Sequence, residues 1–74
     1  MAKKIMIIVR DDCGLPRAWA TGPANEEAEV RARADREWAA RIARRTEDGT
    51  LDLFGGDTRG ETTLHEVDEN AVSL

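Results

Sequence analysis

The 74-residue sequence is poor in residues that build covalent links, metal sites and catalytic centres. It holds one cysteine, one histidine, one phenylalanine and no tyrosine. The single Cys13 excludes an internal disulfide and favours a reducing compartment, because small secreted domains usually depend on disulfides. Cys13 and His65 lie in no known motif, and together they cannot furnish a tetrahedral zinc site or a supported nucleophile–base pair. We therefore expect no metal, no cofactor and no enzymatic activity.

Long hydrophobic runs are also missing. The longest apolar stretch, residues 5–9, is too short for a signal peptide core or a membrane span. We therefore expect a cytoplasmic protein that does not contact membranes. A chain of this length forms one domain with a thin core, and such domains often gain stability from a partner or a second copy, so a homodimer is compatible with the sequence.

The charge is present but unevenly distributed, with a net value of −4. Residues 1–46 carry ten basic and seven acidic side chains, a balance of +3. Residues 47–74 carry one basic side chain, Arg59, and eight acidic ones, a balance of −7. The second part should therefore repel nucleic acid and attract basic surfaces.

Two strands and a turn are predicted in the first third of the chain. Residues 3–10 contain a continuous, mostly β-branched apolar run, which indicates a central strand. Residues 11–14 form a turn, with Gly14 free to adopt a positive φ. Pro16 opens a strand over residues 17–21 and marks it as an edge strand, because proline lacks the N–H that a central strand needs.

A long helix is predicted next. Asn25 is a suitable N-cap, and alanine-rich sequence without proline or glycine continues to Arg45. Gly49 is a suitable stop just beyond the last turn. The apolar stripe that should face the sheet recurs every four residues and consists of Val30, Ala34, Trp38 and Ile42.

The last third of the chain predicts two more strands. Residues 50–54 alternate, with Leu51 and Leu53 inward, and residues 55–60 form a glycine-rich loop. Residues 61–67 form a weaker strand whose inward set is either Leu64 with Thr62, or His65 with Thr63 and Val67. The fold class is therefore α+β, in the order β-β-α-β-β, with one long helix packed on a mainly antiparallel four-stranded sheet. Residues 1–67 form a single domain, and residues 68–74 form a C-terminal tail.

Two groups of residues are candidates for binding a protein partner. Arg17 and Trp19 alternate onto one face of the edge strand, and both residue types are enriched at binding hot spots; packing in the core is the alternative for Trp19. The second group is acidic and could imitate a nucleic-acid backbone, which makes the protein a candidate nucleic-acid mimic. Its members are Asp52, Asp57, Glu61, Glu66, Asp68 and Glu69.

Direct nucleic-acid binding is a weaker expectation. The helix arginines are interleaved with carboxylates, so a surplus of positive charge builds up only in the last turn. A small nucleic-acid-binding module that uses this Arg-rich helix end is an alternative function.

The stretch Ile-Met-Ile-Ile-Val-Arg-Asp-Asp at residues 5–12, Arg-Ala-Trp-Ala-Thr-Gly at residues 17–22 and Glu-Glu-Ala at residues 26–28 resembles HicB-type antitoxin domains. Those domains begin with a hairpin, followed by a glycine and a helix that starts with Glu-Glu-Ala. The similarity lies within residues 5–28. It implies a partly related fold and, as a second alternative function, an antitoxin module that neutralises a toxin by occupying its site.

The whole chain also resembles, in type, the small inhibitors that phages and mobile elements encode against host defences, including anti-CRISPR proteins. It shares their small size, acidity and lack of catalytic parts. The resemblance implies a non-catalytic inhibitor that blocks a nucleic-acid-handling complex, such as a CRISPR effector, by protein–protein contact. This is the function that we expect first.

Overall fold

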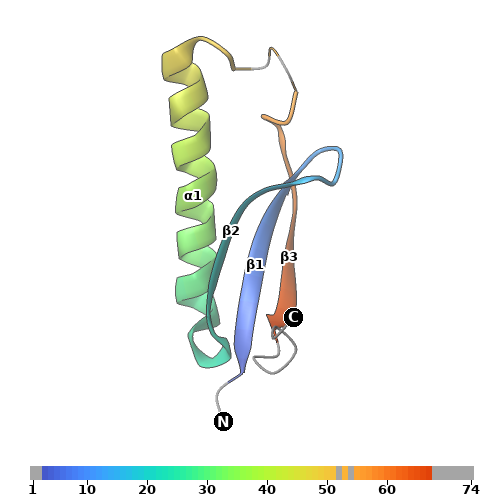
Figure 1. Ribbon diagram of the computed structural model, residues 1–74, viewed down its shortest axis with the longest axis vertical. Coiled ribbons are helices and arrows are strands. Elements are labelled where there is room, and N and C mark those ends of the chain that lie inside the picture. Colours follow the sequence, from blue (N-terminus) through green and yellow to red (C-terminus); the bar gives the residue numbers. More distant parts are fainter. Residues whose placement is uncertain (1–2, 52, 54, 68–74) are drawn as a thin grey trace, which may run out of the picture.

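A computed structural model describes residues 3–51, 53 and 55–67 of the chain. The strands are antiparallel and lie in the order β2-β1-β3, so the apolar first strand is central, as predicted (Figure 1). The elements follow in the order β1 (Lys4–Asp11), β2 (Pro16–Pro23), the short 3₁₀ helix η1 (Ala24–Glu26), α1 (Glu27–Asp48) and β3 (Arg59–Val67).

The predicted four-stranded sheet is wrong, because the described residues form three strands in the order β-β-α-β. The segment predicted as the third strand turns instead. The N–H of Thr50 donates to the carbonyl of Arg45, and the N–H of Leu53 donates to that of Thr50. Leu51 and Leu53 are exposed rather than inward, whereas Asp52 and Phe54 lie outside the described residues. The last predicted strand exists as β3.

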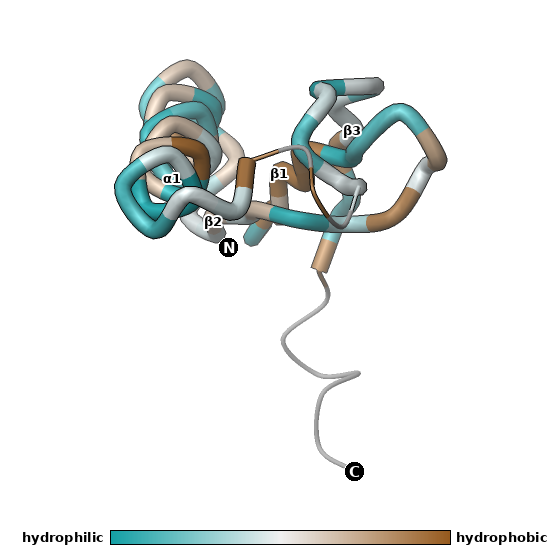
Figure 2. Tube along the Cα trace, turned by 90° about the horizontal axis from the view of Figure 1, so that it is seen from above, coloured by the Kyte–Doolittle hydropathy of each residue, from teal (hydrophilic) through white to brown (hydrophobic). Residues whose placement is uncertain are grey.

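One face of the sheet is covered by α1. Alternate residues of β1, namely Ile5, Ile7 and Val9, are buried against the helix. The predicted stripe meets them with Val30, Ala34 and Trp38 buried and Ile42 partly buried. The helix packs mainly on β2, less on β1, and lies farther from β3, which it contacts through the 2.5 Å Asp35–Arg59 ion pair (Figure 2). The core is therefore a single thin layer between α1 and two of the three strands.

The other face of the sheet carries no helix among the described residues. Met6 and Ile8 lie there half-buried, and Trp19 stands opposite Ile8. The register also decides between the two predicted inward sets of β3. Leu64 pairs with Ile7, so Leu64 and Thr62 point toward the helix side, and the set with Thr63, His65 and Val67 points to the open face.

The ends of α1 differ from the prediction at one side only. Asn25 is not its N-cap: it lies within η1, and no side chain caps either helix start. The C-terminal end is as predicted, because Gly49 adopts the left-handed conformation with φ of 73° and its N–H bonds back to the last turn.

Candidate functional site

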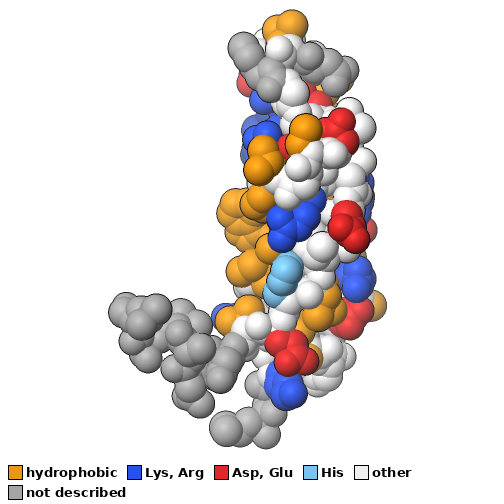
Figure 3. Space-filling view, turned by 90° about the vertical axis from the view of Figure 1, so that its right-hand side faces the viewer, with side chains coloured by type: hydrophobic (Ala, Val, Ile, Leu, Met, Phe, Trp, Pro, Cys, Tyr) orange, Lys and Arg blue, Asp and Glu red, His pale blue; other side chains and the backbone are white. Residues whose placement is uncertain are grey.

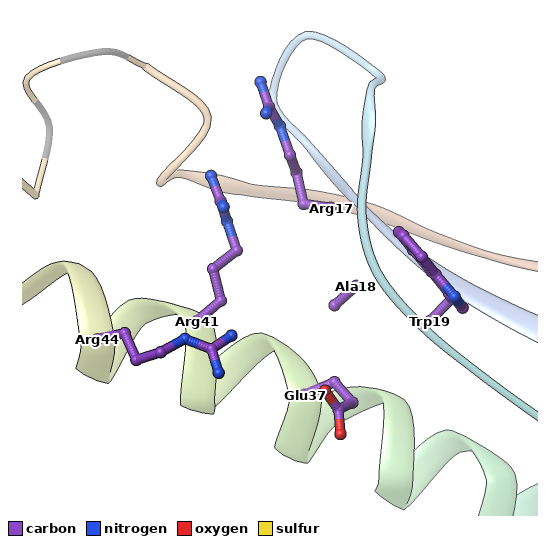
Figure 4. Close-up of a pocket in the computed structure, with 6 residues that line it drawn as sticks. All are labelled: Arg17, Ala18, Trp19, Glu37, Arg41 and Arg44. Carbon is purple, nitrogen blue, oxygen red and sulfur yellow. The ribbon is translucent and has the colours of Figure 1, made fainter.

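A shallow groove of about 250 Å³ runs between the free edge of β2 and one flank of α1 (Figure 4). We call it the edge groove. The helix residues that line it are spaced i, i+4 and i+7, so they share one flank beside the apolar stripe. The lining consists of Arg17, Ala18 and Trp19 from β2 and Glu37, Arg41 and Arg44 from α1.

Close contact near the start of α1 places this flank over the edge of β2. Gly22 makes the approach possible, because a Cβ atom there would lie 2.7 Å from both Val30 Cγ2 and Arg33 Nη2. Arg33 Nη2 also donates a 2.8 Å hydrogen bond to the carbonyl of Thr21. The helix therefore lies over the outer edge of β2 near Gly22, and Arg33 occupies one main-chain acceptor of that edge, the carbonyl of Thr21.

The same bond shows which main-chain groups of β2 point outward. The carbonyl of Thr21 bonds a side chain of α1 and not β1, whereas the N–H of Ala24 bonds the carbonyl of Lys3 next to β1. Residues of an antiparallel strand alternate between facing the partner and facing away. The N–H and C=O of Trp19 therefore face away from β1, at the edge groove.

The sequence prediction that Arg17 and Trp19 share one face is altered by a β-bulge. Val9 pairs with Ala18 and Arg10 pairs with Pro16, so Arg17 is an extra residue without a partner on β1. Its guanidinium reaches the covered side, where it bonds Asp11, whereas the indole of Trp19 points away from α1 (Figure 4). Trp19 is 55% exposed, so it does not belong to the core.

The carboxylate of Asp11 is buried at the end of the hairpin and is held by three donors. It accepts hydrogen bonds from Arg17 Nε at 2.7 Å and from the N–H groups of Cys13 and Leu15 at 2.9 and 3.0 Å. The hydrogen bond from Arg17 lowers the pKa of Asp11 most, followed by the one from the Leu15 N–H. Burial acts in the opposite direction and raises this pKa. Asp11 thereby orients Arg17 at the end of the edge groove.

A second buried carboxylate, that of Asp57, lies near the C-terminal end of α1, where it contacts the groove residue Arg41. Its Oδ1 lies 2.5 Å from Arg45 Nε and 3.4 Å from Arg41 Nη2, and its side chain is fully buried. Arg41 Nη2 also donates to the carbonyl of Gly56. These contacts hold the loop before β3 against α1, and the sequence alone gave no sign of them.

The predicted acidic surface is not a patch in the described part of the chain. Asp57 is buried between arginines, and Glu66 faces Lys3 at 3.9 Å. Glu61 is exposed beside the irregular start of β3. The other three members, Asp52, Asp68 and Glu69, lie outside the described residues.

Cys13 and His65 belong to different ends of the sheet. Cys13 is exposed in the turn after β1, whereas His65 pairs with Met6 near the start of β1 and contacts Thr63 Oγ1 through Nε2 at 2.9 Å. Asp11, Asp12 and Cys13 place potential ligand atoms within 4.8 Å of one another. The Arg17 guanidinium already occupies the Asp11 carboxylate there, so the group is a poor match for a cation.

Comparisons with protein-family models, curated proteins and solved structures found no match. In the described ranges, no helix has the length and apolar character needed to cross a membrane. Sequence reasoning found Arg17 and Trp19, and it considered Arg41 and Arg44 only as part of an Arg-rich helix end for nucleic acid. It did not bring these two groups together and missed Glu37, although the spacing of the three helix residues beside the apolar stripe was a usable signal.

Proposed function

We propose that this chain is a non-catalytic binding protein that holds an extended segment of a partner protein along the edge groove. The observation that carries this proposal is the position of Trp19. It is a half-exposed tryptophan whose main-chain N–H and C=O face away from β1, toward a groove lined by arginines. A partner strand added at such an edge gains main-chain hydrogen bonds, and the indole supplies an apolar anchor.

The charge of the groove favours an acidic partner segment. Three arginines line it against one carboxylate, Glu37. Arg17 and Arg41 are engaged by Asp11 and Asp57, whereas Arg44 makes no ion pair with another described residue. Arg44 is therefore available to a carboxylate of the partner, and the groove has the sign opposite to that of the acidic surface predicted from sequence.

The setting we propose is inhibition of the anti-CRISPR type. The chain would block a CRISPR effector or another nucleic-acid-handling complex in the cytoplasm by protein–protein contact. Its small size and acidity support this setting, and the exposed thiol of Cys13 suits a reducing compartment. An antitoxin role of the HicB type would use the same edge groove against a toxin. A toxin gene beside the gene for this chain would favour the antitoxin role.

The test compares partner binding by the wild type, Trp19→Ala and Arg44→Glu. Partner captured from the native host would be identified, purified and titrated against each variant. We expect Trp19→Ala to weaken binding by about 30-fold, the effect of losing a hot-spot residue, and Arg44→Glu to weaken it most at low salt. Arg36→Glu is the matched control, because Arg36 is exposed and pairs with Glu29 instead of lining the groove. Equal affinity of the wild type and Trp19→Ala would refute the proposal.

A second candidate is nucleic-acid binding at the same groove. The observation that favours it is that Trp19 and Arg44 line the same groove, since an exposed indole can stack on a base while an arginine contacts a phosphate. Against it, Arg41 and Arg45 at the helix end are engaged by Asp57. A gel shift with single-stranded DNA and RNA at low salt distinguishes the two, and a shift abolished by Trp19→Ala would replace the first proposal with this one.

A further inference from the structure

The outer edge of β3 differs from that of β2 because no described element covers it. Among the described residues, β1 is the only strand that pairs with β3, and α1 contacts its start through the Asp35–Arg59 ion pair. Figure 3 views the molecule from the β3 side and shows acidic and basic side chains interspersed along its length. The segment 62–67 contains no proline and no lysine, the residues that usually protect an edge from pairing. As far as residues 3–51, 53 and 55–67 show, this edge is therefore open to another strand.

The hydrogen-bond alternation shows what the edge offers. The odd-numbered residues of β1 direct their main-chain groups toward β2, so Met6 and Ile8 direct theirs toward β3. Their partners, His65 and Thr63, face back toward β1. The residues that direct N–H and C=O outward are therefore Thr62, Leu64 and Glu66.

We propose that this edge binds a second copy of the same chain, with the two β3 strands antiparallel about a twofold axis at Leu64. In this register Leu64 faces Leu64 of the second copy, and Thr62 faces Glu66. Every outward N–H and C=O of the three residues then has a partner. No other twofold register pairs all three outward residues. The result is one continuous sheet that runs through both copies.

The side chains agree with this register. Leu64 is 37% exposed and apolar, and the axis would bury it against its own copy. Arg59 Nη2 donates to Asp35 Oδ1 of α1 at 2.5 Å and to Thr62 Oγ1 at 3.1 Å, so its guanidinium is held beside the residue that would pair with Glu66 of the second copy. In the single chain, Glu66 has only a long, exposed contact with Lys3. The symmetry therefore places Glu66 of each copy beside an Arg59 that already pairs with Asp35 in its own chain, and it places no like charges directly opposite each other.

The area of the interface sets the expected stability of the dimer. Two strand edges bury less area than the roughly 1,200–2,000 Å² of a stable interface. The dimer should therefore form and dissociate with concentration. Sedimentation of the wild type should show a mass that rises from 8.2 kDa toward twice that value. On the same rise in concentration, the amides of Thr62, Leu64 and Glu66 should gain protection from hydrogen exchange, whereas those of Thr63 and His65 are protected throughout.

The first variant tests the main-chain bonds. Leu64→Pro removes an outward N–H and leaves the β1–β3 ladder intact, a position where an edge strand tolerates proline. We expect it to weaken dimerisation by at least about 10-fold, with an unchanged circular dichroism spectrum. Leu64→Ala keeps the N–H and should have a smaller effect.

The second test uses charge reversal and mixing. Glu66→Arg and Arg59→Glu each place like charges at both pairs, so each alone should dimerise roughly 10-fold more weakly. An equimolar mixture of the two variants restores both pairs in a heterodimer and should dimerise more tightly than either variant alone, although Arg59→Glu still lacks the pair with Asp35 in its own chain. Glu47→Arg is the matched control, an equal charge change on the exposed end of α1.

Three results would overturn the proposal: a wild type that stays monomeric to millimolar concentration, a mixture that gains nothing over its components, or protection of the odd-numbered amides alone. Trp19→Ala should leave dimerisation unchanged. A failure at β3 is therefore distinguishable from a failure of the edge groove.

Discussion

The two faces of the sheet are built from alternate residues of the same strands, yet in the part of the chain that the structure describes a helix covers only one of them. On the covered face Ile7 is 0% exposed against α1, whereas on the open face Trp19 is 55% exposed. A single helix is wide enough to cover two strands of one face, so the core ends there. Stability is therefore concentrated on one side, and substitutions on the other side can change binding at little cost to folding.

The largest expected effect separates the faces directly. Ile7→Ala removes buried methyl groups and should lower the free energy of unfolding by about 2–5 kcal/mol, enough to unfold most of a domain with so thin a core. Ile8→Ala, on the half-buried open face, should cost less than about 1 kcal/mol. Urea denaturation measures both. Should Ile7→Ala leave the chain unfolded, Ile7→Val gives the comparison at about 0.5–1.5 kcal/mol. Equal losses at Ile7 and Ile8 would mean that the open face is covered in solution.

The next prediction tests whether the stability of the covered side also depends on its buried ion pairs. Asp57→Ala leaves Arg41 and Arg45 without their carboxylate. We expect a loss of about 2–3 kcal/mol, less than for a fully dry pair because both arginines remain one-fifth exposed. Thermal denaturation compares it with Asp57→Asn, which keeps the shape and should lose less. An unchanged melting temperature would show that the loop before β3 needs no such anchor.

A pH titration tests the other buried carboxylate of the covered side. The pKa of Asp11 is lowered in the folded chain, so the folded state stays deprotonated where the unfolded state already binds a proton. Its stabilisation is complete above about pH 4, the ordinary pKa range of aspartate, and is lost as the pH falls through the lowered pKa. Asp11→Asn should be less stable than the wild type at pH 7, and the gap should narrow in acid. A gap that does not change with pH would contradict the Arg17 interaction.

The smallest effect on stability is expected on the open face. Trp19→Ala should change the free energy of unfolding by less than about 1 kcal/mol, although it removes the proposed anchor for the partner. Chemical denaturation followed through Trp38, the remaining tryptophan, measures this change. A loss comparable to that of Ile7→Ala would place Trp19 in the core and remove the distinction between the faces.

Local patterns predicted most of the covered face. The β-branched run of β1, the edge position of β2 and the stripe through Val30, Ala34 and Trp38 follow from periodicity and from proline and glycine placement. The predicted strand over residues 50–54 was wrong because alternation over five residues does not specify a neighbouring strand with which they could pair. Gly49 instead leads the chain into a turn in which Thr50 bonds Arg45.

The site was less predictable because its contacts join distant segments. The alternation that placed Arg17 and Trp19 on one face ignored a bulge that only pairing with β1 reveals. Asp57 looked like part of an exposed acidic surface, and its burial depends on the path of a loop that brings it to Arg41 and Arg45. Charge counted along the chain therefore says little about charge on the surface.

The central position of β1 has a consequence for the order of folding. Its pairing with β2 closes a short hairpin, but its pairing with β3 joins Lys4 to Val67, almost the whole described length. The entropy lost on closing a loop grows with its length, so β3 should add to a preformed hairpin and helix and detach before them. Each detachment bares the edge of β1. In a crowded solution, the β3 of another molecule could then occupy that edge in an exchanged dimer.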